Sequence, residues 1–131
     1  MSTPRRTDPF SELYGDFAAR LRGDRWQPDV DVFETEDAVV VRVEIAGIRS
    51  EDVRVSVDGP ALRISGVRRA PDDAGVQRLH QMEIASGPFE RRVRIPTAFD
   101  PNRVSARLAD GFLLVTLARR PSARRRVRVE A

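Results

Sequence analysis

Few residues of this chain are of types that perform chemistry, and their spacing predicts no catalytic centre. His80 is the only histidine, and there is no cysteine. No serine stands in a Gly-x-Ser-x-Gly pattern, and no glycine-rich phosphate-binding loop is present. Asp72 and Asp73 are adjacent carboxylates, but no further ligand follows them at the spacing of a metal site. The sequence therefore predicts a protein that is not an enzyme and needs no cofactor or metal.

Arginine is the residue type through which the chain is expected to recognise other groups. All 23 basic residues are arginines, and the 20 acidic residues leave a net charge of only +3. The arginine fork suits carboxylates and interfaces better than the point charge of lysine does, although genomic base composition is the simpler explanation of this bias. Arginine is also dense between Arg119 and Arg128. Such a run attracts phosphates, so a basic-tailed nucleic-acid-binding module stays open as an alternative.

Arg91 is the most informative single charge. By strand alternation it shares a face with Phe89, Val93 and Ile95, so it points where apolar side chains are expected. A buried guanidinium without a partner is costly, and we therefore expect an acidic partner for it. The alternative is that strand twist carries Arg91 to a solvated edge.

The elements that must position these residues are strands. Between residues 28 and 118 apolar and polar residues alternate, turn residues recur, and no stretch predicts a helix. Asp110 and Gly111 form a two-residue hairpin signal between two alternating runs. The pattern predicts an all-β fold, an immunoglobulin-like antiparallel β-sandwich and not a parallel α/β sheet. The expected strands are 29–34, 39–45, 53–57, 62–65, 89–95, 104–108 and 112–117.

Residues 68–88 do not fit this pattern, because they are too many for a hairpin turn. Within them a short segment has strand character: Val76, Gln77, Arg78, Leu79, His80, Gln81 and Met82. A strand on an extended loop must pair with an edge outside its own sheet. The alternative is a floppy excursion within one subunit.

Two extensions flank the predicted domain at residues 26–119. Residues 1–25 are predicted to form a partly helical arm, since Pro9 suits a first helical position and Gly23 can end the helix. The arm carries an apolar stripe at helical spacing: Phe10, Leu13, Tyr14, Phe17 and Leu21. Residues 120–131 are predicted to be a flexible extension. It ends in Val127 and Val129, which face the same way on an extended chain.

Composition also bounds the expected location. No apolar run approaches the roughly 18–20 residues that a membrane span needs. The first residues lack the continuous apolar stretch of a secretory signal, and the absence of cysteine excludes disulfides. We therefore expect a cytoplasmic protein without membrane contact.

Several motifs, in the right order from about residue 26 to 129, resemble the small heat shock protein family in its bacterial and plant branch. Residues 26–36 resemble the opening of its α-crystallin domain, and residues 79–96 resemble its dimerisation loop and the following strand. The shorter matching motifs are Ala46-Gly47-Ile48, Glu51-Asp52-Val53, the Ala-x-x-x-x-Gly-x-Leu signature at Ala106, Gly111 and Leu113, and the terminal Ile-x-Ile motif at Val127-Arg128-Val129.

The chain departs from the family pattern at three places. Ala46 replaces the usual proline, which affects only local stiffness. The N-terminal arm is short, and valines replace the isoleucines of the terminal motif. The last two departures bear on the size and stability of a large oligomer and not on the fold.

The resemblance implies a homodimer in which segment 76–82 crosses to the partner's first strand, supported by Arg91. The strand that it would meet comprises Asp29, Val30, Asp31, Val32 and Phe33. Val127 and Val129 would then dock on a neighbouring subunit, in a groove lined by Val53, Val55, Val104 and Leu108, although a frayed terminus without a partner is an alternative. Unfolded client proteins would bind the stripe from Phe10 to Leu21, or the stripe would stay packed inside the assembly.

The function that the resemblance implies is that of a molecular chaperone that holds unfolding proteins without ATP. Its rivals are the nucleic-acid module and a sandwich-fold co-chaperone that serves one specific protein partner. The nucleic-acid module is disfavoured, because no recognition helix is predicted and acidic residues nearly balance the charge. The co-chaperone would need neither segment 76–82 nor the paired valines.

Overall fold

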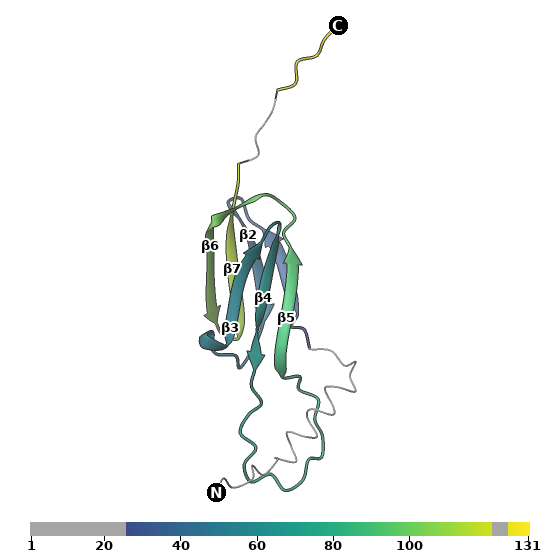
Figure 1. Cartoon of the computed structure of the whole chain (residues 1–131), viewed down its shortest axis with the longest axis vertical. Coiled ribbons are helices and arrows are strands. Elements are labelled where there is room, and N and C mark those ends of the chain that lie inside the picture. The colour runs from purple at the N-terminus through teal and green to yellow at the C-terminus, as the bar shows by residue number, and fades with distance from the viewer. Residues whose placement is uncertain (1–25, 122–125) are drawn as a thin grey trace, which may run out of the picture.

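The computed structural model describes residues 26–121 and 126–131 of the chain. Two antiparallel sheets lie face to face (Figure 1), one in the order β1-β2-β7-β6 and the other in the order β3-β4-β5. The elements in chain order are β1 (Val30–Glu34), β2 (Ala38–Glu44), the 3-10 turn η1 (Ser50–Asp52), β3 (Val53–Asp58), β4 (Ala61–Arg68), β5 (Gly87–Arg94), β6 (Phe99–Ala109) and β7 (Phe112–Arg119). The predicted all-β, immunoglobulin-like sandwich is confirmed. The predicted helical arm, with Phe10, Leu13, Tyr14, Phe17 and Leu21, lies outside the described residues.

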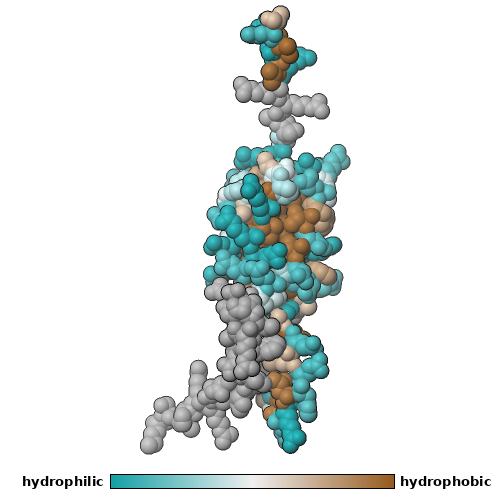
Figure 2. Space-filling model, turned by 90° about the vertical axis from the view of Figure 1, so that its right-hand side faces the viewer, coloured by the Kyte–Doolittle hydropathy of each residue, from teal (hydrophilic) through white to brown (hydrophobic). Residues whose placement is uncertain are grey.

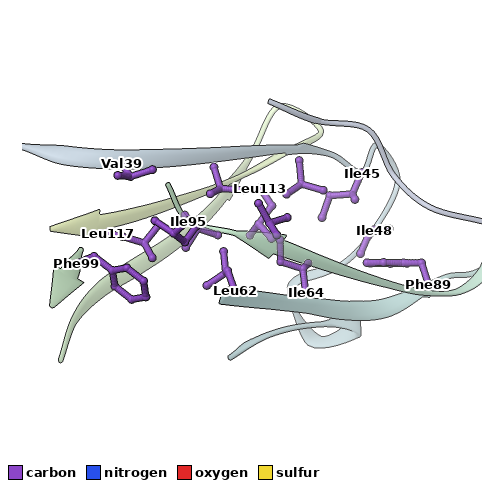
Figure 3. Packing of buried hydrophobic residues seen from close by; sticks show 14 residues of the cluster. Val39, Ile45, Ile48, Leu62, Ile64, Phe89, Ile95, Phe99, Leu113 and Leu117 are labelled. Carbon is purple, nitrogen blue, oxygen red and sulfur yellow. The ribbon is translucent and has the colours of Figure 1, made fainter. Parts of the chain in front are cut away.

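The core forms between the sheets because alternate residues of the strands point inward. Val39, Val41 and Val43 of β2 are fully buried, and β7 contributes Val115 and Leu117 at the same depth. Figure 3 shows this packing, with Phe89 and Ile48 at one end of the core and Phe99 near Leu117 and Ile95 at the other. Period-two patterning thus places the apolar side chains between the layers and the polar ones on the outer faces.

The hairpin between β6 and β7 has the predicted turn. Asp110 and Gly111 have φ values of 55° and 82°, and a type I′ turn requires positive φ at both central residues. The turn also contacts the β2–β3 connection, where the amide of Ile45 donates to the carbonyl of Gly111 at 2.9 Å. The residue types of the turn and its hydrogen bond to Ile45 therefore both stabilise the hairpin at Asp110 and Gly111.

Two stretches differ from the expected strands. β6 begins at Phe99 and not near residue 104, and its pairing with β7 is irregular between Phe99 and Val104. Pro101 lies inside this stretch, and its missing N–H conceals strand character in the sequence. Segment 76–82 belongs to no strand in this structure of a single chain, and none of the described strands pairs with it.

The side of the sandwich between β1 and β5 is closed by the residues that precede β1. Pro28 is buried, and the indole of Trp26 packs on Phe89 with ring centroids 5.2 Å apart. The Trp26 indole N–H donates to the carbonyl of Gly87 at 2.9 Å, and the Gln27 side chain donates to the carbonyl of Glu90 at 3.3 Å. This short segment therefore joins the two sheets and occupies part of the free edge of β5.

Candidate functional site

The outer edge of β1 is open within the described chain. β1 is the last strand of its sheet and pairs only with β2. Val30 and Val32 stand opposite Val43 and Val41 and share their inward face, yet Val32 is 39% exposed. Figure 2, which looks at the β5 side of Figure 1, shows apolar surface at mid-height of the domain. An unpaired strand with apolar residues at its rim is a site for adding another strand.

The outer face of β1 is held by one arginine of β2. Arg42 donates to the carboxylate of Asp31 at 2.8 Å, and its guanidinium lies 5.3 Å from the centre of the Phe33 ring. Phe33 is itself 39% exposed. Asp29, which precedes the strand, is exposed, and its carbonyl accepts from the amide of Glu44 at 3.0 Å. These contacts fix β1 on β2 and leave its other edge available.

The connection from β4 to β5 leaves one end of the sandwich as a long excursion (Figure 1). Within the described chain, the only backbone amide of segment 76–82 with a backbone acceptor is that of Val76, which donates to Asp73 at 3.0 Å. Val76 is 51% exposed, and Gln77, Arg78, His80 and Gln81 are exposed as well. Apolar surface recurs on this excursion in Figure 2. The segment therefore has strand alternation, backbone groups without backbone partners in the described chain, and an exposed apolar side chain at Val76.

A cavity of about 560 Å³ lies between the loop and the β2–β3 connection. Its apolar wall includes Leu79, Met82 and Ile84, and its polar wall includes Arg68 and Arg69. Leu79 and Met82 are half-buried there, whereas Ile84 is 79% exposed. The loop therefore covers only part of its own apolar surface.

The base of the loop contains contacts that the sequence did not predict. Arg68, the last residue of β4, donates from Nε and Nη2 to the carbonyl of Ala85 at 2.9 and 2.6 Å. Its guanidinium lies 4.1 Å from the centre of the Trp26 ring. The available signal was Trp26 itself, the only tryptophan, placed in a polar stretch before the first strand. Its partners are distant in sequence, so no local pattern could name them.

A second pair ties the loop to η1. Arg69 donates to both carboxylate oxygens of Asp52 at 3.1 and 3.0 Å. The Asp52 side chain is only 11% exposed. The hydrogen bond from Arg69 lowers the pKa of Asp52 and raises that of Arg69. The pair therefore stays charged and holds the first loop residue close to the sandwich.

Arg91 lies on the inward face, as alternation predicted, opposite Ile64 and between Phe89 and Val93. It is half-buried, and its Nη1 donates to the carbonyl of Pro28 at 3.2 Å. No ion pair joins it to a carboxylate of the described chain. The expected acidic partner is therefore not found among the described residues of this subunit, where the carbonyl of Pro28 accepts from Arg91 instead.

The residues predicted to line a groove lie on edge strands of opposite sheets. Val53 and Val55 of β3, and Val104 and Leu108 of β6, are partly buried against the core. The valines predicted to dock there are exposed, Val127 by 76% and Val129 by 91%. The single chain thus contains both components of the predicted contact without bringing them together.

The described residues give little support to a metal site or to a membrane-spanning helix. No three of their histidine, aspartate and glutamate side chains gather where they could hold a metal ion. No helix in the described ranges has the length and apolar character to cross a bilayer.

Fold and site together define a β-sandwich domain in which the edge of β1 is open and a strand-like segment, 76–82, is unpaired within the described chain. Residues 31–130 match the model of the Hsp20/alpha crystallin family. The chain belongs to this family of small heat shock proteins.

Two named relatives show the range of similarity. The 21.9 kDa heat shock protein of Oryza sativa subsp. japonica is 45% identical over 102 residues, which are 71% of this chain and 50% of that protein. Heat shock protein 16 of Schizosaccharomyces pombe is 35% identical over 117 residues, 82% of this chain and 80% of that protein. The chain spans about half the length of the rice relatives that it matches.

Solved structures have the same fold. Heat shock protein 16.0 from Schizosaccharomyces pombe is 32% identical, with a TM-score of 0.66 over 82% of this chain and 99% of that one. The hspA protein of Xanthomonas axonopodis is 28% identical, with a TM-score of 0.68 over 76% of this chain and all of that one. A small heat shock protein from Xylella fastidiosa, described as having a distinct high order structure, has a TM-score of 0.67 and 27% identity over 82% of this chain and 100% of that one.

Proposed function

We propose that this protein is an ATP-independent holdase of the cytoplasm, which binds partly unfolded proteins and prevents their aggregation. It performs no catalysis in this proposal. Its working unit is a homodimer in which segment 76–82 of each subunit pairs with β1 of the other. Larger assemblies form when Val127 and Val129 dock against Val53, Val55, Val104 and Leu108 of a neighbour.

One observation carries the proposal: the chain contains an open strand edge and an unsatisfied strand-like segment at the same time. β1 pairs on one side only, and most amides of segment 76–82 lack a backbone acceptor in the described chain. Joining the two in a symmetric dimer satisfies both at once, because backbone pairing across subunits replaces exposed donors and acceptors. Val32 and Val76, each partly exposed, would lose apolar surface to water in the same step.

Client binding is assigned to the stripe Phe10, Leu13, Tyr14, Phe17 and Leu21, together with the β3–β6 groove when the tail leaves it. Apolar burial is non-directional, so such surfaces accept unrelated unfolded chains. Burial of a valine contributes roughly 1.5–3 kcal/mol before the ordering cost of the tail is subtracted. Two valines therefore give a reversible contact, and release of the tail exposes the groove.

The test is to heat an aggregation-prone client with the full chain and without nucleotide, and to follow light scattering. We expect scattering to fall in proportion to added chain. Phe17→Ser should weaken this protection, whereas Ala19→Ser, on the opposite side of the predicted helix, should not. Undiminished client aggregation would refute the holdase, and salt-sensitive binding to DNA or RNA in its place would favour the nucleic-acid module.

A further inference from the structure

Both ends of the β4–β5 loop are attached to one small cluster of side chains. At the outgoing end Arg68 donates two hydrogen bonds to the carbonyl of Ala85, which lies at the returning end. Two residues further on, the carbonyl of Gly87 accepts from the Trp26 indole N–H at 2.9 Å. The loop is thereby closed across its own base by side chains, next to the point where β4 and β5 stop pairing at Arg68 and Gly87.

The two side chains of this cluster also hold each other. The Arg68 guanidinium lies 4.1 Å from the centre of the Trp26 ring, within the range of a cation–π contact. The same ring packs on Phe89 at 5.2 Å, so the cluster is anchored in the core. The Arg68 guanidinium donates two hydrogen bonds to the carbonyl oxygen of Ala85 and at the same time lies over the ring of Trp26. Lysine cannot do both, because its charge is a single point.

We infer that Trp26 and Arg68 are positioning residues for strand exchange: they lock the base of the loop and so direct segment 76–82 away from its own subunit. This inference rests on the proposed strand exchange. It adds two residues that lie neither in segment 76–82 nor in β1, the strand that would receive this segment. A loop with fixed exit and return directions samples fewer conformations, so it loses less entropy when the segment pairs with a partner. The lock thereby strengthens the dimer without contacting the other subunit.

The test uses the full chain, in which Trp26 is the only tryptophan and reports on the lock directly. In Arg68→Ala the indole loses its cover, so its fluorescence emission shifts to longer wavelength. The dimer dissociation constant, measured by sedimentation over a dilution series with Val127→Ser and Val129→Ser present in every full-length chain to remove tail docking, rises about tenfold, equivalent to about 1.4 kcal/mol. Wild-type emission or a wild-type dissociation constant in this variant would overturn the inference.

The matched control is Arg69→Ala, which removes the same charge from the neighbouring position. Arg69 pairs with Asp52, and the described structure records no contact between it and Trp26. Its emission should match the wild type, and its dissociation constant should rise less than that of Arg68→Ala; an equal rise would refute the specific role of Arg68. If Arg68→Ala fails to fold, Arg68→Lys carries the test. It keeps the charge without the two-bond fork, and full wild-type behaviour in it would contradict the lock.

Failure of the exchange itself would be distinguishable from failure of the lock. A wild-type chain that stays monomeric at every concentration would refute the exchange. The lock would then be judged on the loop, by the rate of trypsin cleavage after Arg78. Faster cleavage in Arg68→Ala than in Arg69→Ala would support a locked loop base, and equal rates would overturn it.

Discussion

At the scale of single residues, three arginines link segments that are far apart in sequence. Arg68 joins the two ends of a loop, Arg69 joins that loop to η1, and Arg91 joins β5 to the segment before β1. Each uses a different acceptor, and two of the three acceptors are backbone carbonyls. A planar fork with several donors suits such mixed contacts, whereas the point charge of a lysine would leave some of these acceptors without a donor.

Arg91→Ala is expected to destabilise the domain more than Arg92→Ala does. The carbonyl of Pro28 would lose its donor in a buried residue, at a cost of about 1–3 kcal/mol. Arg92 is exposed and pairs with Asp58 at 3.3 Å, so its loss should change stability by less than about 1 kcal/mol. Urea unfolding at a fixed subunit concentration measures both free energies. Equal effects would show that the inward position of Arg91 contributes nothing.

The Asp52–Arg69 pair predicts a pH dependence of stability with a definite sign. Because the pKa of Asp52 is lowered in the folded chain, the pair adds stability above the ordinary aspartate pKa near 4 and loses it as the pH falls through the lowered value. Asp52→Asn should therefore be less stable than the wild type at pH 7, with the difference closing below about pH 4. Urea unfolding across pH measures this difference. The control, Asp58→Asn, removes a more exposed partner and should give a smaller difference; a pH-independent gap at Asp52 would exclude its charge as the cause.

At the scale of elements, the two strands that flank the same side of the sandwich have different edges. The edge of β5 receives side-chain donors from Trp26 and Gln27, which satisfy carbonyls that would otherwise face water. The edge of β1 receives no such cover in the described chain. An incoming strand therefore finds free backbone groups on β1 and partly occupied ones on β5, which is why we assign the exchange to β1.

Leu79→Pro is expected to abolish the dimer while leaving the sandwich folded. Within the described chain the amide of Leu79 donates to no backbone acceptor, so the substitution removes no described bond from the subunit. It does remove a donor from the middle of segment 76–82 and fixes its φ, which disrupts strand pairing. Sedimentation measures mass, and circular dichroism verifies the fold. Leu79→Ala is the control and should retain the dimer; a dimeric proline variant would argue against exchange through this segment.

At the scale of the whole molecule, the proposed contacts use different parts of the sandwich. The β4–β5 loop leaves one end, and β7 ends at Arg119 at the opposite end (Figure 1). The groove residues lie on β3 and β6, which are the sheet edges on the side away from β1 and β5. Dimer exchange and tail docking therefore need not compete for surface, and a dimer can serve as the repeating unit of a larger assembly.

Removal of the tail contact is expected to reduce the assembly to a dimer. A chain ending at Ser122, or one carrying Val127→Ser and Val129→Ser, loses the apolar groups that are 76% and 91% exposed in the single chain. The intact protein should exceed the mass of a dimer, and both variants should have the mass of a dimer by light scattering. Arg128→Ser, between the valines and pointing the other way on an extended chain, is the control. Equal masses for all chains would refute the docking role.

The sandwich could be predicted from the amino-acid sequence, because the signals that specify it are local. Alternation in β2 and β7 assigned each residue to the core or to solvent, and the Asp110-Gly111 turn made β6 the hairpin partner of β7. Strand character without a local partner at 76–82 is likewise a property of the sequence. Each of these follows from side-chain period and turn chemistry, which depend only on neighbouring residues.

Which distant groups meet is settled only when the chain folds. The acceptor of Arg91, the stacking of Arg68 on Trp26, the start of β6 at Phe99 and the cover on the β5 edge all depend on how segments far apart in sequence come together. A guanidinium can bond equally well to a carboxylate, a carbonyl or an aromatic face. Which of these partners it binds depends on the groups that folding brings close to it. Residue spacing along the chain does not specify those groups.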